Sequence, residues 1–172
     1  KDVLTINNLN LSYGPKEIFN NLNLSIKYQD RLCLVGDNGV GKSTLIKGIL
    51  KGNNSIKLGS NIKIGYIPQE IEFEDKKIKY LSGGEKVRLK IFCLIQNSYN
   101  FLILDEPTNH IDIDTREMLE ESLKEFTGTI LFVSHDRYFI NKIATSIIEI
   151  KNKNITKYIG NYDEYREKIN KI

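Results

Sequence analysis

One eight-residue segment limits the possible folds of this chain more than any other. It reads Gly36-Asp37-Asn38-Gly39-Val40-Gly41-Lys42-Ser43 and follows an apolar, β-type run at 31–35. A glycine, four residues and then Gly-Lys-Ser is the Walker A spacing of a phosphate-binding loop, which joins a strand to a helix. Backbone N–H groups of such a loop turn toward a phosphate, and the N-terminus of the next helix strengthens anion binding. The segment therefore predicts an α/β fold that binds a nucleotide.

The residues of this loop have distinct expected roles. We expect Lys42 to contact the β- and γ-phosphates of a nucleotide and the Ser43 hydroxyl to bind Mg²⁺. The rest of the phosphate site is expected to come from Gly36, Asn38, Gly39, Gly41 and Thr44. The alternative is an ordinary glycine-rich turn with a solvated lysine. Gly39 and Gly41 together count against it, because a simple turn needs one flexible residue only.

Two carboxylates follow a second apolar run. Residues 101–104 read Phe-Leu-Ile-Leu, and Asp105 and Glu106 come next. Ligands of open α/β sheets bind at the carboxyl ends of the strands, where this pair is expected. Asp105 suits a Mg²⁺ ligand, and Glu106 suits a base that orients or deprotonates an attacking water. The alternative, in which both residues only end the strand at solvent, is disfavoured by the phosphate loop upstream.

A histidine follows a third apolar run, at 129–133. It is His135, in Ser134-His135-Asp136, and the same sheet edge is expected to hold it near Glu106. A histidine at a strand end is often just a hydrogen-bonding residue, but here it can reach the γ-phosphate. We therefore include His135 among the candidate catalytic residues.

Hydrophobic patterning gives the expected elements. Short β-type runs at 3–6, 22–26, 31–35 and 62–67, separated by turn signals, indicate an antiparallel piece near the N-terminus. The runs at 101–104 and 129–133 are each followed by a helix-like segment, which is typical of a parallel sheet covered by helices. Helices are predicted at 42–50, 85–95, 114–126 and 137–144. A hairpin and a helix are predicted from 147 to the end.

Composition excludes several classes of protein. With 172 residues, 40% of them hydrophobic and 27% charged, the chain is expected to fold as a single globular domain. The net charge of +3 is interspersed along the chain and does not argue for nucleic acid. No apolar stretch approaches the roughly 20 residues of a membrane-spanning helix, and we expect a cytoplasmic location. Because the sequence begins at Lys1 rather than Met, we expect a fragment of a longer protein.

A last segment, Leu81-Ser82-Gly83-Gly84-Glu85, precedes the predicted helix at 85–95. Two glycines and a serine at a helix N-terminus form a second anion-binding concavity, which a single globule does not need. The motifs in this order, over essentially the whole chain, resemble the nucleotide-binding domain of ATP-binding-cassette (ABC) proteins. The fold implied is a P-loop NTPase of ABC type: a mainly parallel sheet flanked by helices, with an N-terminal antiparallel β subdomain.

The resemblance implies further roles. Tyr13 looks like the aromatic residue that stacks on adenine, and Gln69 like the Q-loop glutamine near Mg²⁺ and the attacking water. In that family the signature loop completes the ATP site of a second cassette, so Ser82, Gly83 and Gly84 would contact the partner's ATP. The segment around Asn109 and Asp112 resembles the D-loop, and His135 the switch histidine. Hydrolysis would then need a second cassette, in the same parent chain or in a homodimer.

Two segments resemble the ABC-F subfamily in particular. They are 105–112, Asp-Glu-Pro-Thr-Asn-His-Ile-Asp, and 134–139, Ser-His-Asp-Arg-Tyr-Phe, although Ile111 stands where that subfamily usually has leucine. ABC-F members have paired cassettes, no membrane domain, and act on the ribosome in translation or in antibiotic resistance. The resemblance thus implies an ATPase cassette with a ribosomal partner. The alternatives are the motor subunit of an ABC membrane transporter and a nucleotide-dependent switch with negligible turnover.

One stretch departs from the family pattern. Only the 11 residues at 70–80 separate Gln69 from the signature segment, where the family has a longer helical subdomain. We therefore expect that subdomain, around 70–95, to be truncated or missing.

Overall fold

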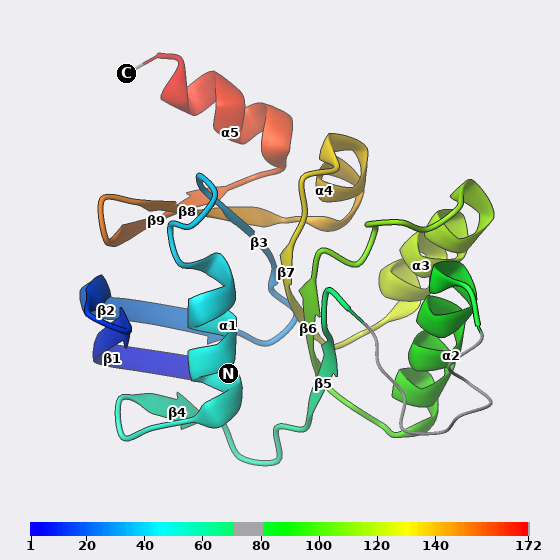
Figure 1. The fold of residues 1–172 in the computed structure, drawn as a ribbon, viewed down its shortest axis with the longest axis horizontal. Helices are drawn as coiled ribbons and strands as arrows, with labels where there is room; N and C mark the ends of the chain where they lie inside the picture. The colour runs from blue at the N-terminus through cyan, green and yellow to red at the C-terminus, as the bar shows by residue number, and fades with distance from the viewer. Residues whose placement is uncertain (71–80, 172) are drawn as a thin grey trace.

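The computed structural model describes residues 1–70 and 81–171, and the short segment at 70–80 therefore lies almost entirely outside the described residues. Two sheets form the framework (Figure 1). The larger has six strands in the order β5-β6-β7-β3-β8-β9, and the smaller has three in the order β2-β1-β4. The α/β class, with a mostly parallel sheet and an N-terminal antiparallel subdomain, is confirmed.

The strands of the larger sheet are short and mostly buried. Five are parallel and the last, β9, is antiparallel to β8. Their bounds are β3 Arg31–Val35, β5 Ile64–Ile67, β6 Phe101–Asp105, β7 Thr129–Val133, β8 Ser146–Lys151 and β9 Asn154–Ile159.

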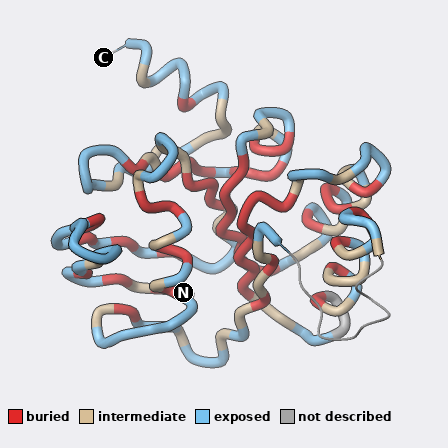
Figure 2. Tube along the Cα trace, in the orientation of Figure 1, coloured by how far each residue is buried: buried red, intermediate tan, exposed pale blue. Residues whose placement is uncertain are grey.

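Alternate residues of these strands enter two different cores. Leu102 and Leu104 of β6 pack on one face of the sheet with helices α2 (Gly83–Gln96) and α3 (Ile113–Glu125), whereas Phe101 and Ile103 pack on the other. The strands are therefore apolar on both faces, and this explains the unbroken apolar runs in the sequence. Figure 2 shows the resulting band of buried chain through the middle of the molecule.

Helices cover both faces of the larger sheet. Helix α1 (Lys42–Lys51) lies between the two sheets, and α2, α3 and α4 (Arg137–Ile143) lie on the opposite side, followed by α5 (Tyr162–Ile169) (Figure 1). The helices predicted at 42–50, 85–95, 114–126 and 137–144, and the final hairpin and helix, are confirmed to within two residues. None of the helices in residues 1–70 and 81–171 is long and apolar enough to cross a membrane.

The N-terminal interpretation is partly wrong. The antiparallel sheet consists of β1 (Asp2–Tyr13), β2 (Lys16–Lys27) and β4 (Ile56–Leu58), and the last strand was not predicted. The runs at 31–35 and 62–67 instead belong to the parallel sheet, as β3 and β5. Spacing along the chain did not distinguish the two sheets, because strand pairing is decided by contacts distant in sequence. β1 and β2 also extend well beyond 3–6 and 22–26, through irregular pairing that the alternation pattern does not reveal.

Candidate nucleotide site

Strand order brings the candidate residues to one edge. Strands β3, β5, β6 and β7 run parallel, so their carboxyl ends meet at the same edge of the sheet. The phosphate loop follows β3, Gln69 follows β5, Glu106 follows β6 and His135 follows β7. Side chains that are distant in sequence are therefore placed around one cavity.

That cavity has a volume of about 620 Å³. It is lined by eleven of the predicted site residues: Tyr13, Asn38, Gly39, Gly41, Lys42, Ser43, Thr44, Gln69, Asp105, Glu106 and His135. Lys16, Ile18, Asn109 and Val133 also line it. Of these four, sequence reasoning singled out only Asn109. One sequence signal could have indicated Lys16 as a lining residue: it directly follows the Gly-Pro turn after Tyr13.

The N-terminus of α1 is open to an anion. Its N-cap residue is Gly41, which makes no side-chain capping bond, and its first turn holds no acidic residue. The other four helices in the described residues are capped by Ser82, Asp112, Asp136 and Asn161. The first N–H groups of α1 are thus left for a ligand, and a phosphate is the group that such a terminus binds well.

Two glycines make the phosphate loop possible. Gly41 has φ +115°, and a Cβ there would lie 2.2 Å from a side-chain carbon of Ile18. Gly36 has φ +151°, and a Cβ there would lie 2.6 Å from the backbone oxygen of Ile150. Lys42 Nζ donates hydrogen bonds to the backbone oxygens of Gly36 and Asp37, at 2.7 and 3.0 Å. The lysine ammonium is therefore held on its own loop, beside the open helix end.

Asp105 is a buried carboxylate beside the loop. Its exposed fraction is 6%, and burial raises its pKa above the ordinary value, against the lowering effects of the Ser43 hydrogen bond and of Lys47 and Lys42. A divalent cation would remove this cost by favouring the ionised carboxylate. Ser43, Gln69 and Asp105 are oxygen donors on one cavity, the donor type that Mg²⁺ prefers, together with phosphate oxygens.

Glu106 and His135 form a hydrogen-bonded pair in the cavity. His135 Nε2 lies 3.1 Å from Glu106 Oε1, and the backbone N–H of His135 donates to Glu106 Oε2 at 3.3 Å. Burial raises the pKa of Glu106, and His135 is the strongest influence that lowers it. A carboxylate with a raised pKa, held by an imidazole, is suited to accept a proton from water.

The backbone of Glu106 is strained. Its φ is +52°, a backbone angle that residues other than glycine rarely adopt. Two hydrogen bonds hold this conformation: the Glu106 N–H donates to the Val133 oxygen at 2.9 Å, and the Asn109 N–H donates to the Glu106 oxygen at 3.2 Å. Strain of this kind is found where the surrounding structure must aim a functional side chain.

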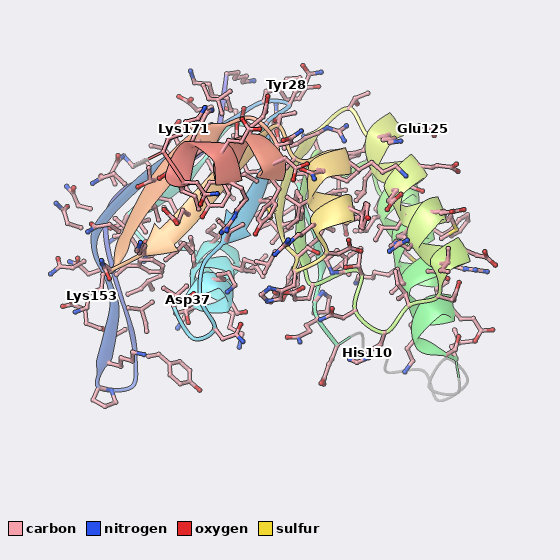
Figure 3. The ribbon with its side chains drawn as sticks, turned by 90° about the horizontal axis from the view of Figure 1, so that it is seen from above. Tyr28, Asp37, His110, Glu125, Lys153 and Lys171 are labelled. Carbon is pink, nitrogen blue, oxygen red and sulfur yellow. The ribbon has the colours of Figure 1, made fainter. Side chains whose placement is uncertain are left out.

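Tyr13 lies at the outer end of the cavity. It pairs with Lys16 across the β1–β2 turn, and 73% of the residue is exposed, so its ring is free to stack on a planar group. Figure 3 shows the side chains from above, with the phosphate loop at Asp37 and the loop at His110 on the same side of the molecule.

Four predicted site residues do not line this cavity. Gly36 faces a neighbouring one, and the signature residues Ser82, Gly83 and Gly84 lie at the N-terminus of α2. That terminus is already capped, since Ser82 Oγ accepts from the Glu85 N–H and the Glu85 carboxylate accepts from the Ser82 N–H. It is therefore less open to an anion than the N-terminus of α1.

The signature segment packs on the loop before α3. A Cβ on Gly84 would lie 2.6 Å from Asp112 Oδ2, and Arg88 Nε donates to Thr115 Oγ1 at 3.0 Å. Arg88 also pairs with Asp112, at 3.5 Å. Glycine at 84 thus allows the two segments to touch.

Comparison with known proteins agrees with this geometry. The profile of the ABC transporter family matches residues 19–73 and 61–109. The chain is 33% identical over 98% of its length to ABC transporter F family member 2 of Arabidopsis thaliana. It is 32% identical over 96% of its length to the ribosome protection protein VmlR of Bacillus subtilis, and 31% identical over 96% to the energy-dependent translational throttle protein EttA of Escherichia coli.

The chain covers 31%, 37% and 38% of these three relatives, about a third of their length. A solved ATP-binding subunit of an ABC transporter superposes with a TM-score of 0.80, covering 98% of this chain and 93% of that one, at 18% identity. This last comparison shows a shared fold only.

Proposed function

The chain belongs to the ATP-binding-cassette family, and from this premise we propose that it is an ATP-hydrolysing cassette whose nucleotide cycle controls attachment to the ribosome. The observation that carries the enzymatic part is the pair of Glu106 and His135 beside an uncapped helix N-terminus. The ribosomal part is supported by relatives in the F subfamily and by two whose names refer to ribosome protection and translation.

Each residue of the site has a separate proposed role in hydrolysis. Lys42 would leave the oxygens of Gly36 and Asp37 and place its charge on the β- and γ-phosphates, while the N–H groups of α1 hold the phosphate oxygens. Ser43, Asp105 and Gln69 would hold Mg²⁺, which neutralises phosphate charge when bound. Glu106 would accept the proton of the attacking water, and His135 would orient Glu106 and contact the γ-phosphate.

Tyr13 would fix the other end of the nucleotide by stacking on adenine. The position of Tyr13 on the same cavity as Lys42, and its exposed ring, support this role. Stacking of a base on an aromatic side chain contributes about 1–3 kcal/mol.

A second cassette is part of the proposal. Ser82, Gly83 and Gly84 lie outside the cavity of their own chain, so they would reach a γ-phosphate only if that phosphate is bound to a second cassette that faces them. Phosphate release by this chain alone should then rise more steeply than linearly with its concentration. A strictly linear dependence from a monomer, checked by sedimentation, would exclude a shared site.

We also propose that the chain lacks a segment present in its relatives. The alignment to the Arabidopsis relative has 210 positions, whereas 98% of 172 residues is about 169, so about 41 positions lie opposite gaps in this chain. The family profile matches in two pieces that overlap at 61–73. Both observations support a missing helical subdomain after Gln69, within a single cassette of a longer protein.

The Glu106→Gln variant of the intact protein tests the function. The amide keeps the size of the side chain but accepts no proton, so ATP should bind and persist while turnover falls about 10² to 10⁴-fold. Lysates are then sedimented through sucrose with and without ATP. ATP-dependent migration with ribosomes is expected, and Lys42→Ala, which should bind no nucleotide, is the matched negative control.

The alternative is the motor subunit of a membrane transporter, a class of protein that includes a solved subunit with the same fold. Recovery of the Glu106→Gln variant in the membrane pellet, and its absence from ribosomes, would support that function instead. Unchanged turnover would remove Glu106 from its role as base.

A further inference from the structure

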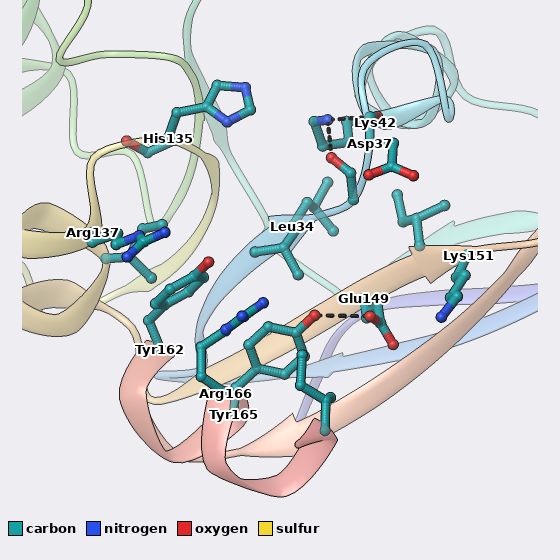
Figure 4. Close-up of a pocket in the computed structure, with 16 residues that line it drawn as sticks. Leu34, Asp37, Lys42, His135, Arg137, Glu149, Lys151, Tyr162, Tyr165 and Arg166 are labelled. Atoms are coloured by element: carbon teal, nitrogen blue, oxygen red, sulfur yellow. Dashed lines mark hydrogen bonds between the residues drawn. The ribbon is translucent and has the colours of Figure 1, made fainter. Parts of the chain in front are cut away.

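A second cavity, of about 400 Å³, lies beside the phosphate loop and beneath α5 (Figure 4). Gly36 and Asp37 line this cavity, whereas the loop residues from Asn38 to Thr44, except Val40, line the nucleotide cavity. The two cavities share only Lys42 and His135 among their lining residues. Their volumes are both in the range of small-molecule sites, so the second is large enough for a ligand of its own.

Three elements each contribute a cation to this cavity. They are Arg137 at the start of α4, Lys151 at the end of β8 and Arg166 on α5. Within residues 1–70 and 81–171, none of these three side chains has an ion-pair partner. Unpaired cations around a concave surface raise its potential and attract anions.

The acidic residues of the cavity do not neutralise these cations. Glu149 accepts hydrogen bonds from the hydroxyls of Tyr165, at 2.8 Å, and Tyr158, at 3.4 Å. Its carboxylate is therefore satisfied by phenols rather than by arginine. Asp37 is the only other acidic side chain on the described lining, while Lys42 adds a fourth cation, so the cavity is positive overall.

Two arginines lie near Tyr162 on the cavity lining. Arg137 Cζ lies 5.8 Å from the ring centroid of Tyr162, a cation–π contact. Arg166 is four residues after Tyr162 on α5 and so shares its helix face. Figure 4 shows Arg137, Tyr162 and Arg166 together on one side of the cavity. A guanidinium offers two parallel N–H donors, the geometry that matches phosphate oxygens.

We propose that this cavity binds a small phosphate monoester, with its phosphate on Arg137 and Arg166 and its remainder against the apolar lining. Two guanidinium groups and an ammonium suit a group that carries about two negative charges, as a phosphate monoester does near neutral pH. Ile169 and the ring of Tyr162, both half-buried, supply apolar surface for the rest of the ligand. This proposal does not depend on attachment to the ribosome.

The shared lysine links the two sites. Lys42 lines both cavities and has a single ammonium group, so an anion in the second cavity competes with ATP for it. A phosphate monoester should accordingly weaken ATP binding, and ATP should weaken binding of the monoester by the same factor.

Calorimetric titration of the intact protein tests the site, with ribose 5-phosphate and inorganic phosphate as separate probes. The Glu106→Gln background saturated with ATP and Mg²⁺ keeps both probes out of the nucleotide cavity. Ribose 5-phosphate should bind with one-to-one stoichiometry, and Arg137→Ala combined with Arg166→Ala should weaken binding about 100-fold. Lys57→Ala combined with Lys124→Ala removes the same charge from exposed positions outside the cavity and should change the affinity less than about twofold.

Two outcomes would overturn the proposal. These are equal affinity in the arginine variant, or an equal loss of affinity in the lysine control. If the double arginine variant has a lowered Tm or no longer binds ATP, the single Arg166→Gln variant is used for the test instead. Its affinity for ribose 5-phosphate should fall about tenfold. Weaker binding of inorganic phosphate than of ribose 5-phosphate supports a role for the apolar lining. Equal affinity for the two probes refutes that role and leaves recognition of the phosphate alone.

Discussion

The imidazole Nε2 of His135 lies 3.1 Å from Oε1 of Glu106, although 29 residues separate them in the sequence. The two residues follow neighbouring parallel strands, β6 and β7, and the backbone N–H of His135 donates to the other carboxylate oxygen of Glu106. The carboxylate is thus held at both oxygens by one residue. Glu106 is buried, whereas the side chain of His135 is 63% exposed, so the pair extends from the protein interior to the open cavity.

The first prediction concerns pH. Burial raises the pKa of Glu106, and the charge of His135 opposes that rise. A base works only when ionised, so hydrolysis should fall as pH falls toward this raised pKa. In His135→Ala the opposing charge is lost while the backbone N–H remains, so the pKa of Glu106 should rise further. The acidic limb of the pH–rate profile should therefore move to higher pH, measured as single-turnover hydrolysis; a limb that stays in place would exclude this coupling.

The second prediction concerns stability. A buried carboxylate with a raised pKa is less stable when ionised in the folded protein than in the unfolded chain, so Glu106 destabilises the fold at neutral pH. Glu106→Gln removes the charge and should stabilise the protein by about 1 kcal/mol, or about 2–4 °C in Tm. The difference should shrink as pH falls and Glu106 becomes protonated. Thermal unfolding without nucleotide at two pH values checks this, and an unchanged or lower Tm at neutral pH would contradict it.

The third prediction concerns the contact between the signature segment and α3. A Cβ on Gly84 would lie 2.6 Å from Asp112 Oδ2 and 2.9 Å from Thr115 Oγ1. Gly84→Ala should therefore cost about 1–3 kcal/mol of stability through overpacking. Asp112→Ser shortens the side chain but keeps an N-cap residue on α3. The double variant should be about 1 kcal/mol more stable than the sum of the two single-variant losses predicts, measured by denaturant unfolding. Strict additivity would show that a Cβ at position 84 does not meet the Asp112 carboxylate.

The fourth prediction concerns a buried ion-pair network between α3 and α4. Glu120 is a buried residue, with an exposed fraction of 4%. Its carboxylate pairs with Lys142 and lies 3.8 Å from Arg116 Nε. Lys142→Met leaves the buried Glu120 carboxylate with Arg116 as a distant partner and should lower the free energy of unfolding by about 1–3 kcal/mol. The loss stays in this range because Lys142 itself is partly exposed. Adding Glu120→Gln should restore much of that loss. The matched control is Lys124→Met on the exposed surface of α3, which should lie within about 0.5 kcal/mol of the parent.

Local patterns predicted most of the residues that line the candidate nucleotide cavity. The phosphate loop, Asp105, Glu106 and His135 all lie within two residues of the end of an apolar run, so their placement at strand ends needs only the strand assignment. Other features were not predicted. Ser82 and Glu85 have the Ser-x-x-Glu spacing of a capping box, a local signal for the cap of α2 that the interpretation of this segment as an anion-binding concavity left out. Lys16 reaches the cavity only because the β1–β2 turn folds toward the phosphate loop.

The sequence by itself determined the class of fold and the candidate residues of the site, because a phosphate loop and buried strands are each formed by residues that are neighbours along the chain. The tertiary structure decided which strands pair, and so moved 31–35 and 62–67 into the parallel sheet. It also decided contacts that the sequence did not predict: Gly84 with Asp112, and Arg137 with Tyr162. Such contacts depend on the packing of whole elements against one another, and no spacing within the chain encodes them.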